Sequence, residues 1–276
     1  MVPVAPVVVT PVEPEAKDGE PVIKVGTTKQ LLAAIGSNRT IVVQPGTYEL
    51  SSVPHRSGEH IRWDDVHDGE ELVIHGVQNL TIEAARDDRP IILAEPRYAW
   101  VIKLEGVAKV TLDNLVLGHT PAGGCTGGVV GVSDSSDVTI KRSDLFGSGT
   151  VGVGLSRVSG FRFESSAIRE CTYGIAEIDR SSDVAFVDSE MTANGEYDLV
   201  TLAASPEVVF RGCRLHDNHI NKGFGHVFFK LDESSSLAVV DSQLENNDFE
   251  TLTNRRDRVS ISCQAVDAAK LAALDP

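Results

Sequence analysis

The chain has 276 residues, of which 41% are hydrophobic and only 5% are aromatic, and its formal net charge is −15. A hydrophobic fraction of this size supports a substantial core, and its Val, Leu and Ile are typical of β-strands. The negative charge repels phosphate backbones, so we expect no nucleic-acid partner; it also disfavours polyanions such as pectin or alginate unless a cation bridges. No apolar run reaches the roughly 18 residues of a membrane span, so no transmembrane segment is predicted.

The N-terminal stretch, residues 1–24, is rich in proline and valine. We predict a disordered leader or linker there, because proline-rich segments stay extended and carry no core of their own. Such tethers often follow an export signal or a lipid anchor, although no signal peptide is visible in this sequence. We therefore expect an extracellular, periplasmic or cell-envelope location; the alternative is a disordered tail on a cytoplasmic protein.

A short capping helix is predicted next. Thr27 and Gln30 have the spacing of a capping box, an amphipathic turn follows, and Gly36 is the expected stop. An apolar strand and the turn Pro45–Gly46 come after it. This unit would cover the open end of a stack of strands, which repeat proteins need. Residues 51–70 are interpreted as a polar loop, and the chain ends in a last strand and a short Ala/Leu helix.

A repeated pattern carries the fold prediction. Two apolar residues alternate with polar ones, then come a small residue, one more apolar residue and a turn. Copies start at seven positions: Asn79, Lys109, Asp137, Gly160, Asp183, Glu207 and Ser236, which lie 30, 28, 23, 23, 24 and 29 residues apart. Each period holds two or three short strands and has no room for a helix. The pattern therefore predicts an all-β parallel β-helix with one repeat per coil.

Equivalent positions of successive repeats form columns. One column contains only small residues: Ser143, Ser166, Ser189, Cys213 and Ser242. Asn194, Asn218 and Asn247 form another, and stacked Asn side chains can hydrogen-bond along the stack. We interpret Cys171 and Cys213 as buried members of such columns rather than as nucleophiles, because a buried free Cys behaves as a small apolar residue.

Several short segments carry a family resemblance: His67-Asp-Gly69, Asn79-Leu-Thr-Ile82, Pro96-Arg-Tyr-Ala99, Gly118-His-Thr-Pro121, Cys125-Thr-Gly-Gly128 and Glu170-Cys-Thr-Tyr-Gly174. With the repeats, they make the chain similar to the right-handed parallel β-helix superfamily, the pectin-lyase-like fold, and more narrowly to bacterial β-helix repeat proteins of undefined activity. The resemblance implies a right-handed parallel β-helix over residues 25–276, a single domain with terminal caps.

The resemblance does not define an activity, because this fold carries lyases, hydrolases, esterases and adhesins. Polygalacturonase-like hydrolases resemble one another in a Gly-His-Gly, but here Gly118-His119 continues to Thr120. The Arg-x-Pro-x-x-Arg of pectate lyases is absent as well. Whether the protein is an enzyme stays open; if it is one, we expect a polysaccharide lyase or a glycoside hydrolase-like enzyme.

The first candidate site lies in the two longest early coils, where Asp68, Arg97, Tyr98 and His119 fall at turns. Arg97 could clamp a carboxylate, and His119 could transfer protons near neutral pH. The alternative is that these residues cap coils and fill turns. Glycines crowd the neighbouring coils, and they are interpreted as a flat, open face that a sugar chain can approach; simple turn geometry is the alternative.

The second candidate site surrounds His216 and His226 in a later long coil. Their composition is metal-like, but no helix fixes their spacing, so no metal is predicted. His226 falls in register with Tyr173, Tyr197 and Phe249. Such an aromatic column is a sugar platform if it faces outwards and core stacking if it faces inwards. We expect core stacking.

Three further candidates, Glu177, Asp198 and Lys230, fall on strands beside this column. Two carboxylates at a suitable separation would permit glycoside hydrolysis. The acidic loop before residue 70 is compatible with calcium, but a solvated loop is the better interpretation, so we predict no cofactor. The leading hypothesis is a secreted or cell-envelope protein that binds a polysaccharide or cell-surface partner along one face, with processing as an open extension. The alternative is a non-catalytic structural, adhesion or protein-interaction module.

Overall fold

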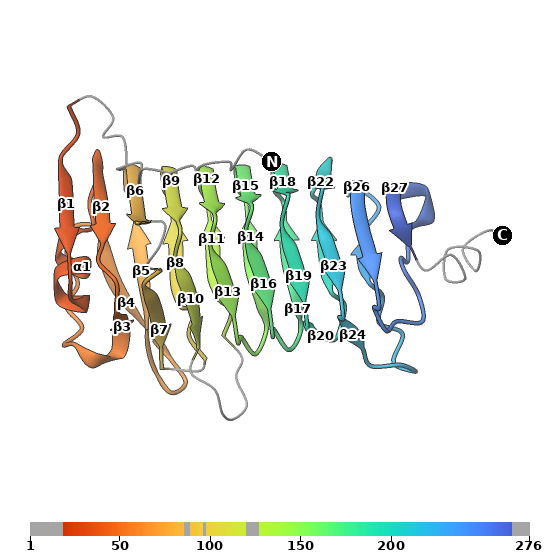
Figure 1. Cartoon of the computed structure of the whole chain (residues 1–276), viewed down its shortest axis with the longest axis horizontal. Helices are drawn as coiled ribbons and strands as arrows, with labels where there is room; N and C mark the ends of the chain where they lie inside the picture. Colours follow the sequence, from red (N-terminus) through yellow and green to blue (C-terminus); the bar gives the residue numbers. More distant parts are fainter. Residues whose placement is uncertain (1–18, 86–88, 96–97, 120–126, 267–276) are drawn as a thin grey trace, which may run out of the picture.

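The computed structural model describes residues 19–85, 89–95, 98–119 and 127–266. In this part of the chain, parallel strands stack coil upon coil into a rod whose long axis runs from the strand at residues 22–25 to the strand at residues 259–266 (Figure 1). The predicted right-handed parallel β-helix is therefore confirmed. No helix among these residues is long and apolar enough to cross a membrane.

Each complete coil in the middle of the rod contributes one strand to each of three faces, and the terminal coils contribute fewer. The first face contains β1 (Val22–Val25), β2 (Arg39–Val43), β6 (Gln78–Ala84), β9 (Ala108–Asp113), β12 (Ser136–Lys141), β15 (Ser159–Glu164), β18 (Ser182–Val187), β22 (Val208–Arg211), β26 (Leu237–Glu245) and β27 (Val259–Val266). The second contains β3 (Thr47–Glu49), β7 (Ile91–Ala94), β10 (Val116–His119), β13 (Asp144–Phe146), β16 (Ala167–Arg169), β19 (Glu190–Thr192) and β23 (Arg214–His216).

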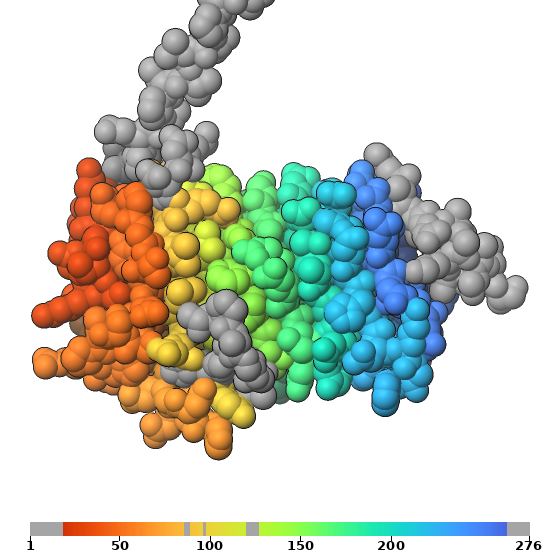
Figure 2. Space-filling view, turned by 60° about the horizontal axis from the view of Figure 1, so that its bottom comes forward, coloured from red at the N-terminus to blue at the C-terminus, as the bar shows by residue number. Residues whose placement is uncertain are grey.

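The third face contains β5 (Gly69–His75), β8 (Ile102–Glu105), β11 (Val130–Ser133), β14 (Val151–Ser156), β17 (Gly174–Asp179), β21 (Val200–Ala203) and β25 (Phe229–Leu231). Two short strands, β20 (Gly195–Glu196) and β24 (His219–Ile220), pair beside it. Figure 2 shows the coils as successive bands along the rod.

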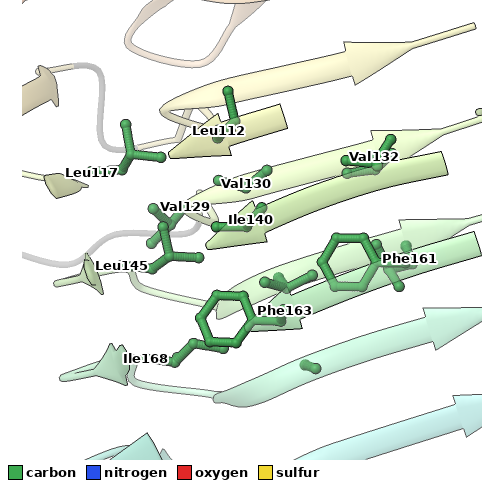
Figure 3. Close-up of a cluster of buried hydrophobic side chains, with 14 of the residues drawn as sticks. Leu112, Leu117, Val129, Val130, Val132, Ile140, Leu145, Phe161, Phe163 and Ile168 are labelled. Carbon is green, nitrogen blue, oxygen red and sulfur yellow. The ribbon is translucent and has the colours of Figure 1, made fainter. Parts of the chain in front are cut away.

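The core is a set of inward-facing columns. In the ladder of the first face, Leu112 pairs with Ile140, Ile140 with Phe163, and Phe163 with Phe186. Figure 3 shows Leu112, Ile140 and Phe163 among the side chains packed between the faces. Phe186 then stacks on Phe210, with ring centroids 4.4 Å apart. The repeat places its apolar residues in the same inward position of every coil, so the core runs the length of the rod.

The coils turn at corners where a left-handed residue precedes a small buried one. Asp188 has φ +48° and precedes Ser189. The Ser166 amide donates to Ser189 Oγ at 3.2 Å, and the Ser143 amide donates to Ser166 Oγ at 2.9 Å. Each hydroxyl thus satisfies an amide of the preceding coil that the turn leaves without a strand partner. The predicted small-residue column is confirmed, and this hydrogen bond is its physical basis.

The predicted Asn ladder is also present. Asn218 Oδ1 accepts from the Asn194 amide at 3.0 Å, and Asn247 Oδ1 accepts from the Asn218 amide at 3.1 Å. Cys171 starts the same column, since its amide donates to Asn194 Oδ1 at 3.1 Å. Cys171 and Cys213 are free and buried. Burial raises the pKa of both thiols to about 11, so both stay protonated at neutral pH.

The N-terminal cap contains the predicted helix, α1 (Thr28–Ala34). Thr27 Oγ1 accepts from the Gln30 amide at 3.2 Å, and Gln30 Oε1 accepts in return from the amide of Gly26 at 2.9 Å. The helix ends at Ala34, before the predicted stop. The predicted leader boundary at residue 24 is wrong, because β1 pairs with β2 from Val22 onwards. Residues 1–18 and the C-terminal helix predicted after β27 lie outside the described residues.

The polar loop predicted for residues 51–70 is wrong over its second half. After a 3-10 turn (Leu50–Ser52), β4 (Ile61–Val66) pairs antiparallel with β5, and the hairpin turns between Val66 and Gly69. The strand pattern is hard to see in the sequence because β4 carries charged residues. In the structure these residues are paired: Arg62 forms salt bridges with Asp64 and Glu105, each at 2.8 Å. Ile61 and Trp63 of the same strand pack against the core.

Candidate functional site

The outer surface of the third face carries a tryptophan that the backbone holds in place. Trp100 lies just before β8, and its amide donates to Glu71 Oε2 at 3.0 Å. Glu71 is buried, and its other oxygen accepts from Lys103 Nζ at 3.1 Å. A buried carboxylate that is satisfied by an amide and an ammonium group is a firm anchor. The backbone at Trp100 is therefore fixed relative to the sheet.

The indole of Trp100 lies across glycines of the next two coils. A Cβ built on Gly154 would lie 2.5 Å from indole Cη2, and one built on Gly131 would lie 3.0 Å from Cδ2. A Cβ on Gly128 would also collide with the ring. These glycines, named here the glycine shelf (Gly128, Gly131 and Gly154), make room for the ring. The open glycine face predicted from the sequence is thus corrected in part: an indole covers it.

A shallow groove of about 260 Å³ runs beside the half-buried indole. Its walls carry Lys103, Glu177 and Asp179 besides Trp100, and glycines of the shelf form part of its floor. Ladder pairing places Gly154 opposite Glu177 and Ser156 opposite Asp179 on the neighbouring strand. The groove therefore combines an aromatic ring face with carboxylates and an ammonium group. This combination of an apolar surface and a few placed polar groups is typical of small-ligand sites.

The two carboxyls of the groove have different surroundings. The walls displace water around Glu177 and raise its pKa, although the end of the side chain remains accessible. Asp179 instead forms a salt bridge of 2.7 Å with Arg180 and accepts a hydrogen bond of 3.4 Å from Ser156 Oγ. The two residues are two positions apart on one strand and face the same side, with Cα atoms about 6.6 Å apart by the rise of a strand. The pKa of the Glu177 carboxyl is thus raised by burial, while Asp179 is hydrogen-bonded and paired with a cation.

Further along the same face, Asp198 organises a polar cluster. Its Oδ2 accepts from Lys230 Nζ at 2.7 Å, and its Oδ1 accepts from the Val227 amide at 2.8 Å. His226 Nδ1 lies 3.7 Å from the same carboxylate. In the strand ladder, Glu177 lies opposite Thr201, which lies opposite Lys230. The structure therefore brings Asp198, His226 and Lys230 together, and it places Glu177 two strands away from Lys230 on the same face.

The aromatic column beside this cluster faces outwards, so the expected core stacking is wrong. The rings of Tyr173 and Tyr197 are 4.3 Å apart, and those of Tyr197 and His226 are 5.1 Å apart. Tyr197 is 39% exposed, and Phe224, whose ring is 6.5 Å from His226, is 77% exposed. Phe249 differs, because it packs on the buried Phe228. Apolar residues two positions later in the same coils already fill the inward positions: Ile175, Leu199 and Phe228.

The other predicted site residues lie apart. His119 is 1% exposed, and its Nε2 is 3.1 Å from the carbonyl of Gly128, beneath the glycine shelf. Asp68 lies at the tip of the β4–β5 hairpin and accepts from the amide of Tyr98 at 3.2 Å. His216 lies on the second face between Glu190 and Asp217. Arg97 lies outside the described residues.

Within the described ranges, no three His, Cys, Asp or Glu side chains are grouped so that they could hold a metal ion. Of the groove residues, sequence reasoning missed Lys103, Asp179 and above all Trp100. The signal was the run of glycines at outward positions of the two coils that follow it. Those glycines would have indicated a large side chain lying flat across them.

Comparison with known proteins agrees with this architecture. The family described as the right handed beta helix region matches residues 102–265, so the chain belongs to that family. A search of the curated proteins finds no match.

Solved structures share the fold at low sequence identity. The pectin methylesterase from Aspergillus niger has a TM-score of 0.55 at 9% identity, over 93% of this chain and 88% of that one. Pectin methylesterase PemA from Erwinia chrysanthemi has a TM-score of 0.52 at 10% identity, over 95% and 96%. A pectin methylesterase mutant in complex with a hexasaccharide has a TM-score of 0.53 at 11% identity, over 88% and 89%.

Proposed function

We propose that the protein binds a polysaccharide on its third face, with one sugar ring stacked on Trp100. The observation that carries this proposal is the indole lying flat on the glycine shelf beside a groove lined by Lys103, Glu177 and Asp179. An aromatic ring face fits the apolar face of a sugar, while carboxylates and an ammonium group can hydrogen-bond its hydroxyls. A structural neighbour in complex with a hexasaccharide supports the use of this fold for such ligands.

The proposed ligand is a neutral polysaccharide, because the net charge of −15 works against a polyanion. We place the function at the cell envelope or outside the cell. The Pro/Val-rich composition of residues 1–18 supports this location, because it is typical of an extended tether.

Affinity electrophoresis tests the proposal. The protein is run through gels that contain mixed-linkage β-glucan, galactomannan, arabinoxylan or polygalacturonate. We expect a neutral polysaccharide to retard the protein, Trp100→Ala to abolish the retardation, and Trp63→Phe to leave it unchanged. Trp63 is the control because it lies on β4, away from the groove, where its ring stacks on that of His55 with centroids 3.6 Å apart. Equal retardation of the Trp100→Ala variant, or none of the wild type in any gel, would contradict the proposal.

Hydrolysis of the bound chain is a second candidate function, favoured by the contrast between Glu177 and Asp179. In an inverting reaction, Glu177 donates its proton to the glycosidic oxygen as the C–O bond breaks. Asp179 accepts a proton from a water whose oxygen bonds to the anomeric carbon. The Cα atoms of the two residues lie about 6.6 Å apart by the rise of a strand, which allows their flexible side chains to reach the carboxyl separation that inverting enzymes use. We expect the wild-type protein to release reducing ends from the polysaccharide. The Glu177→Gln variant should release none, although the gel should still retard it.

A further inference from the structure

We propose that the outward aromatic column forms a second subsite, which binds further units of the same neutral polysaccharide as the chain runs along the rod axis. This subsite, named here the aromatic strip, consists of Tyr173, Tyr197, Phe224 and His226. The inference rests on the proposed function, because it extends the Trp100 groove. It adds to the proposed function a minimum length for the ligand and a direction, along the rod axis, in which the bound polysaccharide runs.

The first argument is that the strip exposes rings that the fold could have buried. Phe224 is the most exposed large apolar side chain of the described residues, at 77%. It stands at the tip of a loop between Gly223 and Gly225, whose φ angles are +83° and +76°. Left-handed backbone on both sides is readily adopted by glycine and projects the ring from the coil. Exposing a phenyl ring to water is unfavourable, and a bound partner that covers the ring removes this cost.

The second argument is that the strip continues the Trp100 groove. The glycine shelf ends at Gly154 on β14, and the next coil carries Tyr173 directly before β17. Tyr197 and His226 follow in the next two coils, in contact with one another. From β14 to β25 the chain advances three coils, about 14 Å at the spacing of paired strands. Aromatic surface is thus offered in successive coils on one side of the rod.

The third argument concerns the charge of the occupant. Between the indole and the strip, Glu71 pairs with Lys103, Asp179 with Arg180 and Asp198 with Lys230. Among the described carboxyls that line the groove and the Asp198 cluster, only that of Glu177 stands outside these three pairs. The path is therefore close to neutral within a strongly acidic protein. A neutral chain of hydroxylated rings fits such a surface better than a polyanion or a strongly basic peptide does.

The test measures how affinity depends on ligand length. Oligosaccharides of two to eight units, prepared from mixed-linkage β-glucan, galactomannan and arabinoxylan, are titrated against the full chain. Intrinsic fluorescence in a Trp63→Phe background reports on Trp100 alone, since the chain has two tryptophans. We expect affinity to rise with length, and a Tyr197→Ala/Phe224→Ala variant to bind the longest ligands about three- to tenfold more weakly. The shortest ligands should bind it as they bind the wild type.

Ile91→Ala is the matched control, because Ile91 is 38% exposed but lies on β7 of the second face. Trp100→Ala, which removes the fluorescent reporter and is therefore titrated by calorimetry, should weaken short and long ligands alike. If affinity is independent of length, or if the strip variant binds long ligands normally, the second subsite is refuted while the proposed function stands. If no ligand of any length changes the fluorescence and no gel retards the protein, both fail. Capture of a protein partner by Phe224 without any glycan binding would also overturn the inference.

Discussion

Trp100 and Gly154 are in contact across two coils: a Cβ built on Gly154 would lie 2.5 Å from Cη2 of the indole. The glycine is therefore required by a ring that starts 54 positions earlier in the sequence. Gly154→Ala should tilt the indole away from the shelf, shift its fluorescence to the red and weaken polysaccharide binding about tenfold. Gly26→Ala is the control, since its nearest neighbour would be 3.8 Å away. A Gly154→Ala variant with unchanged fluorescence and binding would show that the ring does not depend on the shelf.

Overpacking a corner should destabilise the rod. Ser189 is buried, and its hydroxyl fills the space between the Ser166 amide and the carbonyl of Phe163. Ser189→Leu should lower the free energy of unfolding by about 1–3 kcal/mol, because a larger side chain does not fit and an amide loses its partner. Urea denaturation measures the effect. Ser182→Leu, at an exposed position of β18, should be close to neutral, and equal midpoints for the two variants would contradict the prediction.

The Asn ladder should be cooperative along the stack. Asn218 is buried, accepts from Asn194 and donates from Nδ2 to the carbonyl of Met191 at 2.9 Å. Asn218→Ala removes the partner of the buried Asn194 amide and a donor to the Met191 carbonyl, which should cost about 1–3 kcal/mol. Chemical denaturation compares it with Asn221→Ala, an exposed Asn nearby. Faster amide exchange at Asn194 in the Asn218→Ala variant would locate the effect, and unchanged exchange there would speak against it.

The raised pKa of Glu177 makes stability depend on pH. A carboxyl whose pKa is higher in the folded state favours folding while it is protonated, below its unfolded pKa of about 4.3. That contribution is lost as the pH rises through the folded pKa. Glu177→Gln removes the titration, so its melting temperature relative to wild type should be higher at pH 7 than at pH 4. Glu59→Gln, at a position with an 89% exposed side chain, should show no such trend; an identical trend in both variants would refute the assignment.

The sequence by itself determined the coiled architecture, because every coil of the stack needs the same kinds of residue at the same positions. A corner needs a small residue, an inward position needs an apolar one, and each recurs once per turn, as at Ser166 and Ser189 or at Phe163 and Phe186. Periodicity therefore revealed the fold, the Ser and Asn columns and the buried Cys171 and Cys213. The β4–β5 hairpin escaped this reasoning because it occurs once and its strands carry charged residues.

Only the tertiary structure decided which side of each column faces solvent. Tyr173, Tyr197 and His226 share a register that predicts their alignment, but alignment is the same for a core stack and a surface strip. Their direction follows from Leu199 and Phe228, which already fill the inside of the turn. The position of the Trp100 ring likewise depends on glycines in two later coils. Contacts between coils, rather than local propensity, therefore positioned the candidate site.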